Sequence, residues 1–301
     1  SIGKVDSAIE ALKASIDAGH APSGTCITCA FLLLEVNRAA DAKAVIEKGI
    51  RNGMAQGDDV KELDGMAALL DRVARGPSWV KTHEYKSAHY HVSSDIDRET
   101  CASAAQILED AYMIYSGRLR PVTKGGPPFR VFLFAGQAGY ERYAKELSFG
   151  ATPAHTAGLY FNQLKQLAIW NLPERREMMR TVLHEGFHQY LDRLCPGEVP
   201  VWFNEGCAVY YENAGQVNGQ WTTGQIDPQH GPKARSVVRS PSFDLHRFLN
   251  IRPQNFYTDA AANYAVAWAF VQYLRHSTPD NKKLFDAFLD HLISGMGSKR
   301  A

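Results

Sequence analysis

The sequence lacks any long apolar run. Its longest, CAFLLLEV, falls far short of the roughly 18 to 20 consecutive apolar residues that a membrane-spanning helix requires. The chain starts at Ser1 without Met and without a basic, apolar leader, which fits a processed mature chain or a trimmed one. We therefore expect a soluble protein with no membrane span. Its compartment stays open, and a secreted or extracytoplasmic bacterial protein after signal removal is one interpretation.

Net charge of either sign is also nearly absent. Lysine and arginine together number 33, against 32 aspartate and glutamate residues, for a formal net charge of +1. Such a chain has no overall field that would attract nucleic acid, so we expect no nucleic-acid partner. The 45% of apolar residues are ordinary for a globular protein and can build a core in a chain of 301 residues.

Cysteine is scarce, with five residues in the chain. Five is an odd number, and it is too few for a disulfide scaffold in a chain of this length. Cys26 and Cys29 form a CxxC pair, which could indicate a redox or metal site. They lie, however, in a pattern that recurs 34 residues later, where Val60 and Leu63 take their places. This exchange favours small buried apolar cysteines over reactive ones.

The same recurrence organises the beginning of the chain into helices. Apolar and glycine positions match in pairs: Ala8 and Ala42, Leu12 and Ile46, Ile16 and Ile50, Gly19 and Gly53, Leu32 and Met66, and Val36 and Leu70. A period of 34 is the length of the tetratricopeptide repeat, which these two predicted helical hairpins resemble. Because stacked neighbours bury the faces of such repeats, we expect this arm to pack on the next part of the chain or to end a longer array.

The segment TVLHEGFHQ, from Thr181 to Gln189, contains the order His-Glu-x-x-His. In a helix, His184 and His188 lie on one face with about 5 to 6 Å between their Cβ atoms, so both imidazoles can bind one ion. Glu185 lies about 100° further round the helix and flanks that ion, where a general base for an activated water is needed. The alternative is a core helix with two hydrogen-bonded histidines.

Two histidines are an incomplete set, because a catalytic zinc ion has three protein ligands and one open position. Glu205 lies 17 positions after His188 in VWFNEGCAVYYE, a segment long enough for a second helix packed on the first. A carboxylate buried among such apolar residues is costly unless a cation such as Zn²⁺ neutralises it. A disulfide between Cys195 and Cys207 would fix Glu205 against the first helix, and free thiols are the alternative.

These segments resemble the gluzincin metallopeptidases, in which HExxH is followed by a glutamate ligand on the next helix. HEGFHQ followed by PVWFNEG is most similar to the peptidase MA-like domains of bacterial proteins. The resemblance implies His184, His188 and Glu205 as ligands of one Zn²⁺ ion and Glu185 as the general base. The Gly-rich motif that grips a substrate amino terminus is missing, so aminopeptidase activity is not implied.

Gluzincins also hold an extended substrate along an edge strand before the HExxH helix, and they often stabilise the oxyanion with a tyrosine from a later helix. By resemblance, the hairpin of GLYFN and QLAIW is the candidate edge. Tyr264, in a helix expected over 260–275, is the candidate tyrosine. Its alternative role is an ordinary core aromatic, and Tyr210, Tyr211 and Tyr257 are competitors.

Further acidic and histidine residues have two interpretations each. Glu212, seven residues after Glu205, could orient a ligand histidine or be a solvated surface residue. His89 and His91 would share one face of a strand, but nothing nearby supplies a third metal ligand.

A polar stretch comes after the second predicted metal helix. Asn218-Gly219 signals a hairpin over 216–221. Residues 224–242 are rich in glycine and proline, so we expect a surface loop there, with His230 and His246 as ordinary surface residues.

The order of predicted elements favours an α+β fold. Strands are expected over 89–94 and 129–134, followed by the hairpin and the metal helices. We predict an all-α helical-repeat arm over 1–78 and a zincin-like metallopeptidase domain over 79–301, with a small mixed sheet and active-site helices.

Together these patterns predict a zinc-dependent peptidase, an endopeptidase, that acts on a peptide or protein substrate with Glu185 as general base. One rival is an inactive zinc-binding scaffold whose helical arm binds a protein partner. The intact Glu185 argues against it, because a structural zinc site does not require that residue. A second rival is an enzyme that uses another metal or hydrolyses a different amide.

Overall fold

The computed structural model of the chain describes residues 2–19, 21–122, 125–148, 156–218 and 220–295. These residues form many helices and two small sheets, which confirms the α+β class. The chain divides into two compact units, Ser1–Glu109 with Thr123–Leu172, and Asp110–Val122 with Pro173–Ala301. The proposed domain boundary at residue 78 stays a prediction.

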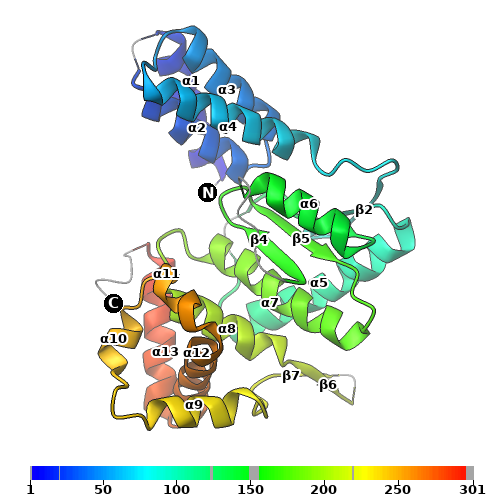
Figure 1. Cartoon of the computed structure of the whole chain (residues 1–301), viewed down its shortest axis with the longest axis vertical. Helices are drawn as coiled ribbons and strands as arrows, with labels where there is room; N and C mark the ends of the chain where they lie inside the picture. The colour runs from blue at the N-terminus through cyan, green and yellow to red at the C-terminus, as the bar shows by residue number, and fades with distance from the viewer. Residues whose placement is uncertain (1, 20, 123–124, 149–155, 219, 296–301) are drawn as a thin grey trace. The chain divides into compact units, whose positions relative to one another are not determined.

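The first unit begins with the two predicted helical hairpins (Figure 1). Their helices are α1 (Ile2–Asp17), α2 (Ser23–Glu35), α3 (Ala39–Arg51) and α4 (Asp58–Arg75). The repeat-related Gly19 and Gly53 both have positive φ, +74° and +69°, just after the first helix of each hairpin. Cys26 and Cys29 are fully buried, and burial raises the pKa of both thiols, in agreement with their apolar interpretation.

The first unit also contains a five-stranded mixed sheet. Its strands are β1 (His83–Lys86), β2 (Tyr90–Ser94), β3 (Phe129–Phe134), β4 (Gly158–Phe161) and β5 (Gln166–Trp170), in the order β1-β2-β3-β5-β4. The central strand β3 is parallel to both of its neighbours, and the outer pairings are antiparallel. The strand β4 therefore lies at an edge, although its role in substrate binding stays a prediction.

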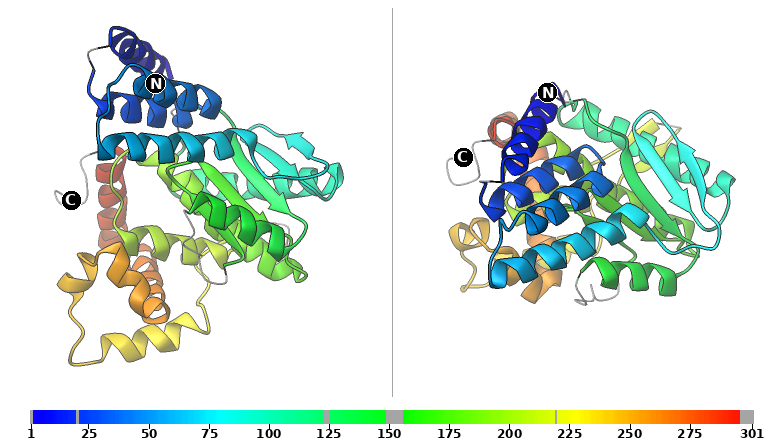
Figure 2. Two further views of the ribbon diagram at one scale, coloured as in Figure 1. Left: turned by 45° about the horizontal axis from the view of Figure 1, so that its top comes forward. Right: turned by 90° about the horizontal axis from the view of Figure 1, so that it is seen from above.

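The helical hairpins share a hydrophobic core with one face of this sheet. Buried residues of α1 to α4 cluster with Phe132 and Phe134 of β3 and with α6 (Gln137–Leu147), which lies along the sheet in Figure 2. The side-chain amide of Asn37 also donates to the carbonyl of Pro128 at 3.0 Å. The arm thus packs on the next part of the chain, one of the two expected arrangements.

The helix α5 (Arg98–Arg118) starts in the first unit and ends in the second. The second unit then contains α7 (Arg175–Leu194), α8 (Val201–Glu212), β6 (Gly215–Val217), β7 (Gln220–Thr222), α9 (His230–Val238), α10 (Leu245–Leu249), α11 (Pro253–Phe256), the short 3₁₀ helix η1 (Tyr257–Asp259), α12 (Ala260–His276) and α13 (Pro279–Ile293). The antiparallel pairing of β6 with β7 confirms the predicted hairpin, while Gly219 of its turn lies outside the described residues. The expected surface loop over 224–242 is wrong, because α9 occupies its centre.

The second unit is held together by packing around α12, which contacts α8, α9 and α13. The two helices α8 and α12 approach each other closely at Gly206, where an added Cβ would lie 2.6 Å from the carbonyl oxygen of Ala267. On the other side, Phe187 of α7 stacks on Tyr211 of α8 with ring centroids 5.2 Å apart. These contacts fix the helices that carry the predicted metal ligands.

All five cysteines are buried and none is in a disulfide, so the bridge between Cys195 and Cys207 considered from the sequence is not formed. Among the described residues, no helix has both the length and the apolarity needed to cross a membrane.

Candidate metal centre

The packing of α7 on α8 brings the three predicted ligands together. His184 and His188, one turn apart on α7, have ring centroids 4.8 Å apart. From α8, the Oε2 atom of Glu205 lies 3.4 Å from Nε2 of His184 and 3.5 Å from Nε2 of His188. Two atoms that are each about 2.0 to 2.1 Å from one tetrahedral ion lie roughly 3.3 to 3.4 Å apart. The three side chains are therefore spaced as ligands of one ion.

The oxygen at the centre of this group has no other partner. Only 6% of the Glu205 side chain is exposed, and its Oε2 atom is buried without a hydrogen bond. A buried carboxylate oxygen without a donor is costly unless a cation occupies the space in front of it. The donor set of two imidazole nitrogens and one carboxylate oxygen fits such a cation.

The outer nitrogens of both histidines are held by acceptors. Nδ1 of His184 lies 2.7 Å from a carboxylate oxygen of Glu212, and Nδ1 of His188 lies 2.8 Å from the side-chain oxygen of Asn204. When each Nδ1 donates its proton to these oxygens, Nε2 presents a lone pair to an ion. The predicted contact of Glu212 with His184 is confirmed, and the alternative that Glu212 is a solvated surface residue is wrong, because only 14% of its side chain is exposed. Asn204 was missed, although it directly precedes Glu205.

Glu185 lies beside the same two histidines. One possible ligand atom from each of His184, Glu185 and His188 falls within 4.8 Å of the others, so these side chains could hold a metal ion together. Glu185 is partly buried and takes the helical position directly after His184, beside the two histidines; its role as general base stays a prediction.

The charged groups of the centre shift one another strongly. Burial of the ring lowers the pKa of His184, but Glu205 and Glu212 outweigh this effect and raise it well above the ordinary value; the pKa of His188 is raised in the same way, mainly by Glu205. Burial raises the pKa of Glu205, yet the two histidines bring it well below its usual range. The acidic neighbours thus favour the protonated forms of both histidines, and a metal ion bound here would compete with those protons.

Two of the four candidate tyrosines belong to the centre. The Tyr257 hydroxyl donates to Oε1 of Glu205 at 2.6 Å, and the Tyr264 ring lies 6.3 Å from that of His184. Burial and the Glu205 carboxylate raise the pKa of both hydroxyls. Tyr210 instead bonds His276 at 3.0 Å, and Tyr211 is packed within the aromatic core.

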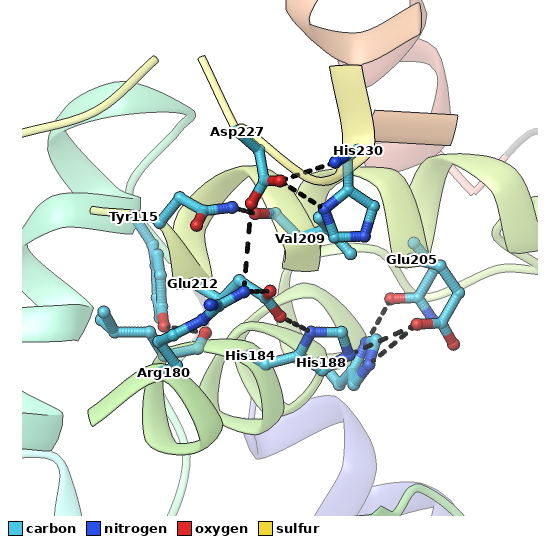
Figure 3. A network of polar contacts seen from close by, with 12 residues as sticks. Tyr115, Arg180, His184, His188, Glu205, Val209, Glu212, Asp227 and His230 are labelled. Atoms are coloured by element: carbon cyan, nitrogen blue, oxygen red, sulfur yellow. Dashed lines mark hydrogen bonds and ion pairs between the residues drawn. The ribbon is translucent and has the colours of Figure 1, made fainter. Parts of the chain in front are cut away.

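A chain of charged residues extends behind His184 (Figure 3). Nη2 of Arg180 lies 2.6 Å from Glu212 and 4.0 Å from Asp227, and Asp227 lies 3.0 Å from Nδ1 of His230. Sequence reasoning missed Arg180 and Asp227. Arg180 is four positions before His184, a helical spacing that could have indicated it, whereas nothing local signals Asp227. His230, expected at the surface, is partly buried, with 20% of its side chain exposed, and pairs with Asp227.

The other histidines considered from the sequence have different partners. His89 lies 2.6 Å from Glu109, and His91 lies 3.3 Å from Glu84. His246 is exposed on α10.

A comparison of the sequence with models of known protein families finds no match, and a comparison with curated proteins finds none either. The chemistry of the site therefore has to carry any functional assignment.

Proposed function

We propose that the centre binds one zinc ion and that the protein is a zinc-dependent peptidase of the gluzincin type, with the zincin-like fold which that type implies. The observation that supports this most is the buried Oε2 of Glu205, unpartnered and equally close to the two imidazole nitrogens. Two histidines and one glutamate, with a fourth position left open, are a ligand set of catalytic zinc sites. His184, His188 and Glu205 would hold the ion.

When bound, zinc would lower the pKa of water towards about 7 and polarise a substrate carbonyl. Glu185, beside the ligands, would accept the proton of the attacking water and then pass it to the leaving amine. A hydroxyl close to the ligands, for which Tyr264 is the candidate, would donate to the oxyanion. Tyr257 would hold Glu205 through its hydrogen bond.

The substitution Glu185→Gln tests the catalytic role. We expect it to leave zinc content unchanged and to abolish hydrolysis of a mixed peptide library, measured with a chelator control. Glu177→Gln, the same change at an exposed position of α7, is the matched control and should keep full activity. His188→Ala should lose zinc.

Two results would contradict the proposal. If Glu185→Gln keeps full activity, Glu185 is not the general base. If His188→Ala keeps its zinc content, His188 is not a ligand. If the unchanged protein binds zinc but cleaves no peptide, the inactive scaffold, with a protein partner on its helical arm, becomes the better hypothesis.

A further inference from the structure

The metal centre is backed by a guanidinium that touches none of its ligands. Arg180 precedes His184 by four positions on α7, so their side chains share one face of the helix. Its Nη2 atom lies 2.6 Å from Oε1 of Glu212, whose Oε2 lies 2.7 Å from Nδ1 of His184. Both oxygens of Glu212 are thus occupied, one by the ligand histidine and the other by Arg180 (Figure 3).

Glu212 needs a partner of this kind. Its side chain is only 14% exposed, and a carboxylate removed from water is costly unless charged or polar groups satisfy it. Without Arg180, Oε1 loses its charge-assisted bond, and the carboxylate gains by turning towards water. Such a turn would remove the acceptor that fixes the orientation and the tautomer of His184.

Arg180 is held in turn from the other side. Asp227 is 4% exposed, and its Oδ1 accepts the backbone N–H groups of Gln229 and His230, each at 2.7 Å. These bonds anchor the carboxylate at the start of α9 and leave Oδ2 facing Nη2 of Arg180 at 4.0 Å. This longer ion pair is weaker than the one between Arg180 and Glu212. Asp227 therefore attracts the guanidinium and favours its orientation, while Glu212 makes the main contact with it.

We infer that Arg180 is a positioning residue of the metal centre, which sets the affinity of His184 for the ion by holding Glu212, with Asp227 behind it. The inference rests on the proposed metal site, but not on peptide hydrolysis. If Arg180 were merely a structural ion pair, its loss would destabilise the metal-free protein and leave metal affinity unchanged.

The experiment measures zinc affinity by competition with a chelator, together with the unfolding temperature of the metal-free protein. We expect Arg180→Ala to weaken zinc binding by about 10- to 100-fold, the usual effect of losing a group that orients a metal ligand. Arg176→Ala, an exposed arginine of the same helix, is the matched control and should bind zinc as the unchanged protein does.

A double-mutant cycle tests the route of the effect. Because Arg180 acts through Glu212, the variant Arg180→Ala with Glu212→Gln should bind zinc no more weakly than Glu212→Gln alone. Asp227→Asn keeps the Oδ1 acceptor and removes the charge facing Arg180, so it should weaken zinc binding less than Arg180→Ala does. It also covers the case in which Arg180→Ala fails to fold.

Several outcomes overturn the inference. If Arg180→Ala binds zinc with unchanged affinity, Arg180 does not act on the metal centre. If the fold-losses of zinc affinity in Arg180→Ala and Glu212→Gln multiply in the double variant, Arg180 does not act through Glu212. Unchanged affinity in Asp227→Asn would remove Asp227 from the arrangement. A protein that binds no zinc refutes the inference and the proposed function together, whereas zinc binding without peptide cleavage refutes only the latter.

Discussion

Gly206 offers a direct test of how closely α8 and α12 approach beside the metal centre. A Cβ added there would lie 2.6 Å from the oxygen and 2.8 Å from the carbon of the Ala267 carbonyl. Ordinary contact begins near 3.4 Å, so the helices would have to separate by about 0.8 Å. Both atoms are backbone, and no rotamer change can relieve the clash. Such overpacking costs about 1 to 3 kcal/mol.

The substitution Gly206→Ala also has a favourable side, because alanine is better than glycine within a helix by about 0.8 to 1.0 kcal/mol. We expect a net loss of between about 0 and 2 kcal/mol in the free energy of unfolding, and a larger loss relative to a glycine-to-alanine control that has only the favourable side. Gly117→Ala is the matched control in the same unit: no atom lies within 4 Å of its added Cβ, so it should lose nothing.

Urea denaturation of the metal-free variants, followed by tryptophan fluorescence, measures both changes. Trp202 of α8 and Trp268 of α12 report on the contact itself. Zinc affinity should fall with stability in Gly206→Ala, since the neighbouring residue is the proposed ligand Glu205. If Gly206→Ala is as stable as Gly117→Ala, the two backbones do not meet at Gly206 and the reasoning is refuted.

Two further predictions concern the protons of the centre. The raised pKa values of His184 and His188 add stability to the metal-free protein that is complete below their ordinary pKa of 6.5 and is lost as the pH rises through the raised values. The lowered pKa of Glu205 adds stability that is present above pH 4.5, its ordinary pKa, and lost as the pH falls through the lowered value. The three shifts together predict that the unfolding temperature of the metal-free protein is highest between pH 4.5 and pH 6.5. Zinc must compete with the histidine protons, so it should stabilise the protein more as the pH rises. Thermal unfolding with zinc and with chelator over about pH 5 to 8 measures both trends. If the stabilisation by zinc did not change with pH, the proposed ligand set would be contradicted. A third prediction separates the two tyrosines. Tyr257→Phe removes the hydrogen bond to Glu205 and should weaken zinc binding. Tyr264→Phe should keep zinc and lower kcat by about 10²- to 10³-fold if its hydroxyl donates to the oxyanion. Equal zinc loss in both variants, measured by metal analysis, would argue against separate roles.

Short-range periodicity predicted the parts of the centre that lie on single helices. The spacing of His184 and His188 places both rings on one face, and the seven-residue step from Glu205 to Glu212 places both carboxylates towards α7. Such spacings are dictated by helix geometry alone. These positions could therefore be predicted from the sequence once two helices in contact were assumed.

Contacts that depend on tertiary packing could not be predicted in this way. Asp227 reaches Arg180 across 47 positions of sequence, and no local pattern encodes that pairing. The helix α9 was missed because Gly231 and Pro232 suggest a turn. Pro232, however, is the third residue of α9, within the first turn, where the N–H that proline lacks would have no helical partner.

The strand β1 was missed for a different reason. Its sequence, HEYK, has no apolar side that would indicate a buried face, and its residues alternate between partly buried and exposed. It is a strand because its backbone pairs with β2 at the edge of the sheet. A strand of this kind is specified by its neighbour, not by its own composition.

The division of the chain into units has a consequence for how the metal centre can be isolated. The backbone passes from the first unit to the second within α5, returns near Thr123, and crosses again after Leu172. No single cut therefore releases the residues around the metal centre as one continuous piece. Tyr115 of α5, whose hydroxyl donates to the carbonyl of Leu183 at 2.6 Å, would be left behind by any fragment that begins at α7. A fragment truncated in this way would lose the support of the backbone at Leu183, the residue before His184, which is the first proposed ligand.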